Sequence, residues 1–223
     1  RTDACPEIGF GHVRRCLVLA GELRKHGVDI RFVCREHEGH LCDQIEALGF
    51  SVARLQRLES EPVPRGKGRV TEYQSWLGAA WSVDAAQTIE ALAAWGPVDW
   101  LVVDHYAIDR RWETTLRSSV GRLMVIDDLA DRLHECELLL DQNLVGEMRT
   151  RYAEKISEKC ALLLGPEYAL LQPVYAELHE LMPPREGTIK RILIFFGGVD
   201  SDNLSGRALT AFLRLNRPDI EVD

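Results

Sequence analysis

The sequence predicts an α/β fold in which parallel strands are covered by helices on both faces. Helical and strand-like segments alternate along most of the chain, and residues 99–103 and 123–126 form nearly continuous apolar runs. Such runs are typical of strands that are buried on both faces of a parallel sheet. Polar residues follow both runs, and ligands of doubly wound sheets bind at the carboxyl ends of the strands. We therefore expect a ligand site at that edge of the sheet.

Hydrophobic spacing and glycine stops define the elements expected in the first part of the chain. Apolar residues recur at helical spacing after His12, and Gly27 provides a C-terminal stop. Residues 56–70 are rich in Pro, Gly, Arg and Glu without periodicity, so we expect a mobile surface loop there. The expected elements are a helix over 12–26, a strand over 30–34, a helix over 39–48, a strand over 50–55, and a long helix or bent pair over 71–95 with Trp76, Trp81, Ile89 and Leu92 as core contacts.

The alternation continues in the second part of the chain and then restarts. Pro173 lies inside a helical pattern and is expected to kink it. Residues 183–187 have the composition of a linker, and a second strand, glycine turn and helix follow it. The expected elements are strands over 99–103, 123–126, 136–140 and 161–164, helices over 149–157 and 168–181, a buried strand over 191–196 and a helix that ends at Arg214. The expected domains are 1–184 and 185–223.

The two ends of the sequence indicate a piece of a longer protein. The chain starts with Arg1 instead of a methionine, and its last residues, 219–223, read as the start of a strand. A glycine turn that feeds a helix ordinarily follows a strand, and only a stub of one precedes Gly9. We expect that the second domain is only partly present.

Composition excludes several classes of protein. The 223 residues carry a net charge of −8, from 27 Lys and Arg against 35 Asp and Glu, without a basic stripe. Such a chain is a poor candidate for nucleic-acid binding. No apolar run reaches the roughly 20 residues that span a bilayer, and no signal-peptide pattern is found at the start. We expect a soluble, cytoplasmic protein without a membrane partner, and its oligomeric state stays open.

The six cysteines suit a reducing compartment, because they form neither a CxxC pair nor a regular framework. Cys34, His37, His40 and Cys42 are four potential zinc ligands within nine residues. Cys34 ends a strand pattern and Cys42 lies on the apolar face of the next helix, so both are better explained as small buried hydrophobic residues. We expect no metal and no cofactor.

The segment from Gly9 to His12 is the strongest local signal. Gly9 and Gly11 allow a tight turn and a close approach of the backbone to a ligand, and the amino end of the following helix favours an anion. The same helix dipole disfavours a charged imidazole, so His12 is expected to stay neutral and able to accept a proton. The alternative is a tight strand-to-helix turn with a solvent-facing histidine.

Six ordered blocks of sequence carry a resemblance to a known family. The chain resembles the UDP-sugar hydrolases of the pseudaminic acid pathway, which have the two-domain GT-B fold and are related to spore-coat polysaccharide proteins. The resemblance covers essentially the whole chain. Its blocks are residues 3–12 with Arg15, 102–106, 126–128, 140–143, 165–171 and 195–200.

The resemblance implies a fold, a reaction and a set of site residues. The fold would have two Rossmann-like domains whose parallel sheets face a cleft. The reaction would be hydrolysis of a UDP-linked 2,4-diacetamido-2,4,6-trideoxy sugar to UDP and free sugar, with inversion and without a metal. His12 would be the base that activates water, and Tyr106 would orient water or sugar. The expected substrate contacts are Gly9, Phe10, Gly11, Arg15, Asp104, His105, Asn143, Gly197, Gly198 and Asp200.

Several of these positions have a second interpretation. Asp104 would form a hydrogen bond with His12 or the sugar hydroxyls, or else cap the next helix. For Asp127, which has the same alternatives, the helix cap is the better interpretation. Adjacent residues of an extended segment point to opposite faces, so Asp127 and Asp128 do not suggest a glycosidase carboxylate pair. Arg15 would bind phosphate or be a surface residue that forms an ion pair, and His105 would contact substrate or be packed away.

Two other functions use the same residues. A GT-B glycosyltransferase would pass the sugar to an acceptor instead of water, and a UDP-sugar binding module would have no turnover. Uracil and ribose contacts of GT-B enzymes come mostly from the later half of the second domain, beyond this sequence.

Overall fold

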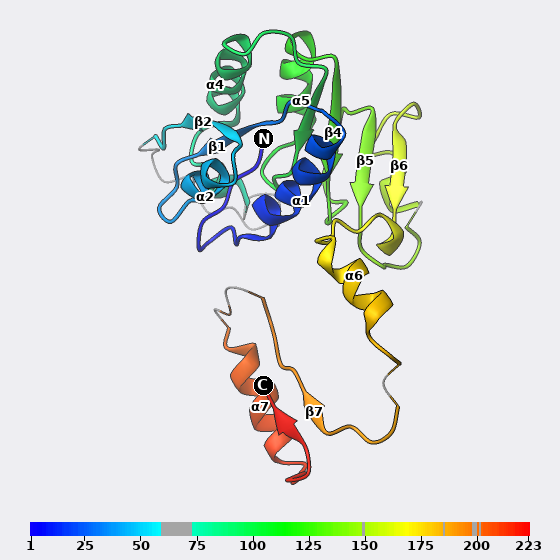
Figure 1. Ribbon diagram of the computed structural model, residues 1–223. Coiled ribbons are helices and arrows are strands. Elements are labelled where there is room, and N and C mark those ends of the chain that lie inside the picture. The colour runs from blue at the N-terminus through cyan, green and yellow to red at the C-terminus, as the bar shows by residue number, and fades with distance from the viewer. Residues whose placement is uncertain (59–72, 149, 185, 198–199, 201) are drawn as a thin grey trace. The chain divides into compact units, whose positions relative to one another are not determined.

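The computed structural model of the chain describes residues 1–58, 73–148, 150–184, 186–197, 200 and 202–223. These residues form two compact units, Arg1–Leu171 and Gln172–Asp223. The first unit has a mixed α/β architecture with parallel sheets, consistent with a Rossmann-like fold (Figure 1). The sequence analysis divides the chain between residues 184 and 185, and that domain assignment stays a prediction.

The strands of the first unit pair in parallel, as the continuous apolar runs predict. A two-stranded sheet and a four-stranded sheet result. The first contains β1 (Arg31–Arg35) and β2 (Ser51–Leu55), and the second contains, in spatial order, β3 (Trp100–Val103), β4 (Arg122–Ile126), β5 (Leu138–Asp141) and β6 (Ala161–Leu164).

The N-terminal residues connect the two sheets. The amide of Thr2 donates to the carbonyl of Val33 at 3.2 Å, and the amide of Asp104 donates to the carbonyl of Arg1 at 3.0 Å. Thr2 and Asp104 form a parallel bridge. The order across the unit is therefore β2, β1, the N-terminal segment, β3, β4, β5 and β6. The chain first winds outward to β2 and then crosses to β3, and such a reversal is the position at which doubly wound sheets bind ligands.

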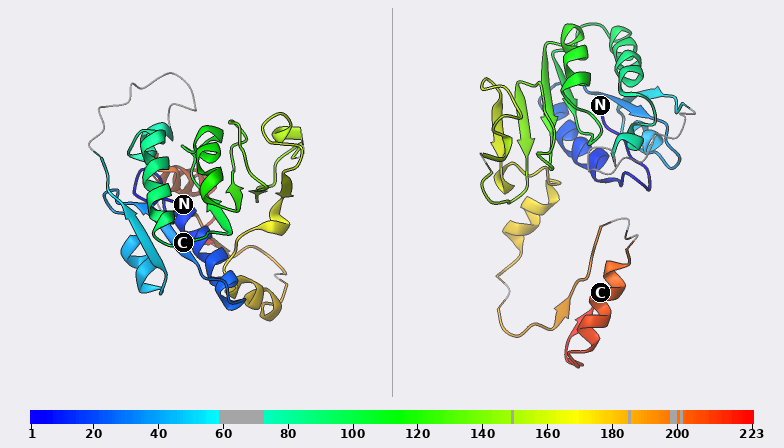
Figure 2. Two further views of the ribbon diagram at one scale, coloured as in Figure 1. Left: turned by 90° about the horizontal axis from the view of Figure 1, so that it is seen from above. Right: turned by 180° about the vertical axis from the view of Figure 1, so that it is seen from behind.

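Helices cover both faces of these strands. α1 (Gly11–Lys25) and α2 (Cys42–Ala47) lie on one face, and α4 (Trp81–Ala93) and α5 (Arg110–Leu116) lie on the other (Figures 1 and 2). The side chains alternate accordingly, because successive residues of a strand point to opposite faces. Phe32 and Cys34 of β1 pack in the cluster that contains α1 and α2, whereas Val33 packs in the cluster that contains α4 and α5.

The remaining described elements are short. Four 3₁₀ turns span η1 (Ser75–Leu77), η2 (Arg117–Ser119), η3 (Thr150–Tyr152) and η4 (Pro166–Tyr168). The second unit contains α6 (Val174–Leu181), β7 (Arg191–Ile192), α7 (Leu204–Leu213) and β8 (Glu221–Val222), and its two strands pair in parallel. None of the helices in the described ranges is long and apolar enough to cross a membrane.

Two expected helices are shorter in the structure than predicted. The helix expected over 168–181 begins only at Val174, with Pro173 as its N-cap, because proline has no amide hydrogen to donate within a helix. The helix expected over 149–157 is reduced to the 3₁₀ turn η3. Glu154 follows that turn with a φ of 64°, a left-handed conformation that does not continue a helix.

The region before β3 also departs from expectation. The residues described between 73 and 95 contain η1 and α4, separated by Gly78 with a φ of 64°, so the bent pair is the correct alternative for them. The helix expected over 39–48 is confined to α2. The expected mobile loop over 56–70 lies largely outside the described residues.

The strand expected over 191–196 is wrong in length and burial. β7 contains only Arg191 and Ile192, and Phe195 is 71 % exposed. Backbone pairing continues past β7, because the amide of Ile194 donates to the carbonyl of Asp223 at 2.9 Å.

Candidate active site

α1 begins after a glycine turn, next to the carboxyl end of β3. The amide of Gly9 donates to the carbonyl of Cys5 at 2.8 Å, and Gly9 has a φ of 82°. Phe10 is the N-cap of α1 and provides no side-chain hydrogen bond to the helix. The first-turn amides of α1 therefore lack a side-chain cap, and His12 is the second residue of this turn.

His12 and Asp104 form a buried pair at this point. The Nδ1 atom of His12 lies 2.6 Å from Oδ1 of Asp104, which follows β3 directly. Asp104 is fully buried, and the side chain of His12 is 8 % exposed. Within the described ranges, no hydrogen-bond partner contacts Nε2 of His12.

The charge of Asp104 determines which ring nitrogen of His12 carries the hydrogen. Burial alone would raise the pKa of Asp104, but hydrogen bonds from Arg15 and His12 together hold it well below its usual range. An ionised carboxylate only accepts hydrogen bonds, so Nδ1 of His12 must carry the proton that it shares with Asp104. In the neutral ring, Nε2 is then left with a free lone pair and can accept a proton.

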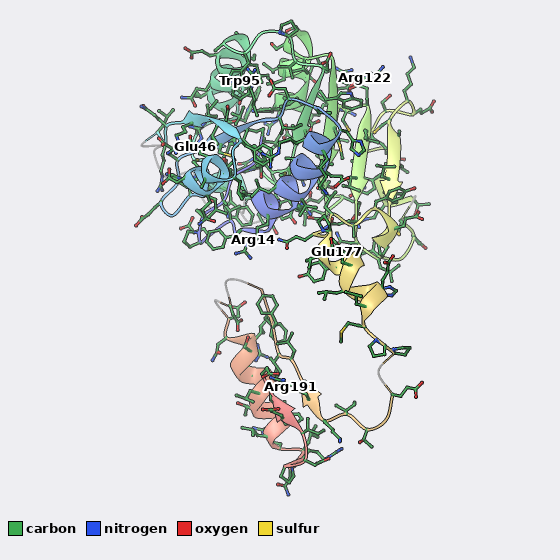
Figure 3. The ribbon with its side chains drawn as sticks, viewed as in Figure 1. Arg14, Glu46, Trp95, Arg122, Glu177 and Arg191 are labelled. Atoms are coloured by element: carbon green, nitrogen blue, oxygen red, sulfur yellow. The ribbon has the colours of Figure 1, made fainter. Side chains whose placement is uncertain are left out.

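Arg15 completes the support of Asp104. Its Nε and Nη2 atoms donate to the two oxygens of Asp104, each at 2.6 Å, and Nη1 donates to Asp128 at 2.7 Å. The neighbouring Arg14 is exposed on α1 (Figure 3). The side chain of Arg15 is only 10 % exposed. The structure thus shows Arg15 in carboxylate ion pairs, but not at the surface, where the ion-pair alternative expects it. A contact of Arg15 with phosphate stays a prediction.

Asp128 joins Arg15 to two more of the expected residues. The hydroxyl of Tyr106 donates to Oδ2 of Asp128 at 2.6 Å, and Nδ2 of Asn143 donates to Oδ1 at 2.8 Å. The ring of Tyr106 contacts that of His12 edge-on, with centroids 4.5 Å apart. Burial and the adjacent Asp128 raise the pKa of Tyr106, so this hydroxyl remains a donor. The structure therefore brings His12, Arg15, Asp104, Tyr106 and Asn143 into one network.

An aromatic surface extends this network from Tyr106. Trp76 stacks on Tyr106 with centroids 5.9 Å apart and planes 24° apart, and Tyr73 contacts Tyr106 edge-on at 5.3 Å. The sequence analysis assigns Trp76 to the core, but Trp76 is half-buried beside Tyr106. The sequence analysis thus missed Asp128, Tyr73 and Trp76 as neighbours of the candidate site.

Two other strand-end side chains contact partners other than His12. His105 is buried, and its Nε2 lies 3.3 Å from Asp3, so the packed-away interpretation describes its position. Asp127 accepts from the amide of Ala130 and the hydroxyl of Tyr152. The different directions of Asp127 and Asp128 follow the alternation expected for adjacent residues.

Two of the residues expected in the second unit, Gly197 and Asp200, precede α7. Gly197 has a φ of 88°, and Gly198 lies outside the described residues. Asp200 accepts from the amides of Leu204 and Ser205 at 2.7 and 2.8 Å, so its carboxylate caps α7. Asn203 adds a second cap by accepting from Gly206. Asp200 as a substrate contact stays a prediction.

A mainly apolar cavity of the first unit does not have His12 in its wall. It measures about 780 Å³ and lies between β1 and β3, with Phe32, Leu101 and Met124 in its wall. We place the candidate site at His12 and not in this cavity, because the titratable side chains gather at the other end of β3. In the described ranges no group of three or more His, Cys, Asp or Glu residues has an arrangement that could hold a metal ion.

Comparison with known proteins adds a chemical context to this geometry. No protein-family model matches the chain. The chain is 28 % identical, over 205 residues and 92 % of its length, to UDP-2,4-diacetamido-2,4,6-trideoxy-β-L-altropyranose hydrolase of Campylobacter jejuni. The chain is a distant homologue of that hydrolase. It is also 24 % identical, over 97 % of its length, to an uncharacterized protein of Methanocaldococcus jannaschii.

The chain spans only part of both relatives. The alignment covers 61 % of the Campylobacter hydrolase and 40 % of the Methanocaldococcus protein.

Proposed function

We propose that this chain belongs to an enzyme that hydrolyses a UDP-linked 2,4-diacetamido-2,4,6-trideoxy sugar to UDP and the free sugar. The observation that carries the proposal is the pairing of Nδ1 of His12 with the ionised Asp104, because it leaves Nε2 as a base. The name of the Campylobacter relative supports the substrate class. The proposal includes the GT-B architecture and the place of the reaction in pseudaminic acid synthesis.

The reaction needs little more than a positioned water and a base. Nε2 of His12 takes a proton from water while the water oxygen bonds to the anomeric carbon. The bond between that carbon and the diphosphate oxygen breaks on the opposite face, which inverts the configuration, and UDP leaves with the electron pair. Because a diphosphate is a good leaving group, general-base catalysis and positioning carry most of the acceleration.

The other members of the network have supporting roles in this scheme. Asp104 stabilises the imidazolium that forms on His12, as in other carboxylate–histidine pairs. Arg15 keeps Asp104 ionised, and Asp128 fixes the hydroxyl of Tyr106 next to the imidazole. The uncapped first turn of α1 favours the negative charge of the diphosphate. Gly9, Phe10 and Gly11 would let the substrate approach this turn.

The first test measures turnover by the enzyme to which this chain belongs, in buffer that contains no sugar acceptor. UDP release is expected, with oxygen-18 from labelled water entering the sugar. His12→Ala should lower kcat by about a hundred- to ten-thousand-fold, which is the usual range for a general base. His26→Ala is the matched control, since this exposed histidine lies just after the opposite end of α1. Label in UDP, or release that requires an acceptor, would contradict the proposal.

The second test examines the proton on His12 without requiring turnover. Nitrogen NMR of the neutral imidazole should show hydrogen on Nδ1 and none on Nε2. Asp104→Asn replaces the carboxylate by an amide, which can donate to Nδ1 and so does not require a hydrogen there. The form of His12 with its hydrogen on Nε2 should therefore gain population, and kcat should fall by roughly three to four orders of magnitude. A wild-type ring that carries its hydrogen on Nε2 would contradict the assigned base.

A further inference from the structure

A pair of cysteine sulfurs lies outside the candidate site, at the edge of the four-stranded sheet. The Sγ atoms of Cys136 and Cys160 are 3.6 Å apart. Cys136 precedes β5 and Cys160 immediately precedes the edge strand β6, where Leu138 pairs with Ala161. Both sulfurs therefore sit where the two strands begin, beyond the last paired residues.

The two thiols differ in access to solvent. Cys136 is 5 % exposed, whereas Cys160 is partly exposed and lines a hollow of about 370 Å³ together with Leu162, Leu164, Glu167 and Tyr168. A small reagent in this hollow would meet Cys160 first. Cys136 then lies directly behind it as the second sulfur.

We propose that Cys136 and Cys160 form a reversible thiol–disulfide site that is oxidised by low-molecular-weight disulfides of the glutathione class. The thiolate of Cys160 attacks one sulfur of the oxidant, forms a mixed disulfide and releases one small thiolate. The thiolate of Cys136 then attacks Sγ of Cys160 and releases the second. Two protein thiols and one small disulfide thus become one protein disulfide and two small thiols, and the oxidant gains both electrons.

The geometry suits this sequence of steps. A disulfide bond is about 2.05 Å long, so the two sulfurs need to approach by only about 1.5 Å. The hydrogen bond from Cys136 lowers the pKa of Cys160, which favours Cys160 as the attacking thiolate. The bond would close the segment between residues 136 and 160, and this segment contains Asn143, which holds Asp128.

A second pair of cysteines provides an internal control. Cys34 and Cys42 interact with each other, but they are only 3 % and 1 % exposed and pack against Val13 and Phe32. A small disulfide has no route to either sulfur in the folded chain. The structure thus predicts oxidation at one cysteine pair and protection of the other.

The test incubates the folded chain with glutathione disulfide and maps the products by mass spectrometry. We expect a loss of about 2 Da, a Cys136–Cys160 crosslinked peptide, and full reversal by excess reduced glutathione. Closure of this loop should raise Tm by roughly 5–10 °C. Cys136→Ser should stop at a glutathione adduct on Cys160, whereas Cys160→Ser should leave Cys136 unmodified.

The result that would overturn the proposal is equally specific. It fails if both thiols remain free, if crosslinks join Cys34 to Cys42 instead, or if Cys136→Ser and Cys160→Ser give the same product. Cys34→Ser and Cys42→Ser should oxidise as the unaltered chain does. None of these readouts depends on hydrolysis of a UDP-sugar, so the outcome is independent of the proposed activity.

Discussion

Arg15 holds two carboxylates that belong to different strand ends. Its guanidinium contacts Asp104 after β3 and Asp128 after β4. The planar fork of arginine suits this double contact, because it presents its donors in a fixed geometry. One residue of α1 therefore fixes the position of the base partner, Asp104, and of Asp128, which holds Tyr106.

The depressed pKa of Asp104 predicts a contribution to stability in acid. A carboxylate whose pKa is lower in the folded state stabilises the fold fully above its unfolded pKa of about 3.9. This contribution is lost as the pH falls from there through the folded pKa, by about 1.4 kcal/mol for each unit of depression. Urea unfolding between pH 6 and 3, in steps of about half a unit, should show a shallower acid loss in Asp104→Asn than in the unaltered chain.

The control for that comparison is Asp29→Asn, which removes an exposed carboxylate. Its acid loss should follow that of the unaltered chain. Identical acid slopes for Asp104→Asn and the unaltered chain would show that Asp104 is not held ionised in the fold.

The site residues differ in how far their sequence context reveals them. His12, Asp104 and Tyr106 stand next to a glycine turn or a strand end, so local pattern and resemblance point to them. The sequence analysis rejected Asp127 and Asp128 as a catalytic carboxylate pair, because adjacent side chains point to opposite faces. The same alternation of side-chain direction places Asp128 against Arg15. Trp76 and Tyr106 are 30 residues apart in the sequence, so no local pattern predicts their contact.

At the scale of elements, the Gly9 turn determines where α1 begins. Gly9 has a φ of 82°, and a Cβ atom there would meet no atom within 4 Å. The cost of a side chain at Gly9 is therefore backbone strain and not a clash. Gly11, two residues later, also has open space but begins the helix with ordinary dihedral angles.

This contrast predicts opposite effects of the same substitution. Gly9→Ala should lower the free energy of unfolding by about 1–2 kcal/mol, the cost of a left-handed conformation for an L-residue. Gly11→Ala should leave stability unchanged or raise it by up to about 1 kcal/mol, because alanine favours helix over glycine. Equilibrium urea unfolding measures both, and equal losses in the two variants would rule out strain at Gly9 as the cause.

Elements with a strong apolar pattern were predicted well, whereas elements that depend on individual side-chain contacts were not. β6 has the predicted bounds, and β1, β2, β3 and β4 agree within one or two residues. α5 was not predicted, although Asp109 as an N-cap followed by Trp112 and Leu116 at helical spacing is a usable signal. The expected helix over 149–157 fails because Tyr152 is held by Asp127 and Asp141, contacts that the local sequence does not contain.

At the scale of the whole first unit, a buried ionic cluster ties distant segments together. Asp84 of α4 accepts from the guanidinium groups of Arg1 and Arg35 and from the indole of Trp112. All four residues are buried. The N-terminal segment, β1, α4 and α5 therefore meet at one carboxylate.

Removal of this carboxylate should destabilise the first unit strongly. Asp84→Ala leaves two buried guanidinium groups short of a partner, and the expected loss is about 3–5 kcal/mol of unfolding free energy. Asp43→Ala removes an exposed partner of Arg54 and should change little. Thermal and urea unfolding compare the two variants, and a similar small loss in both would show that the cluster does not stabilise the fold.

The location of Arg1 between β1 and β3 also has a consequence for synthesis on the ribosome. Its carbonyl accepts from the amide of Asp104, a partner 103 positions later. At translation rates of about 5–20 residues per second, roughly 5 to 20 s pass between the synthesis of the two residues. During this interval the side of residues 1–3 that later pairs with β3 has no partner, so we expect this segment to be exposed to chaperones until β3 emerges.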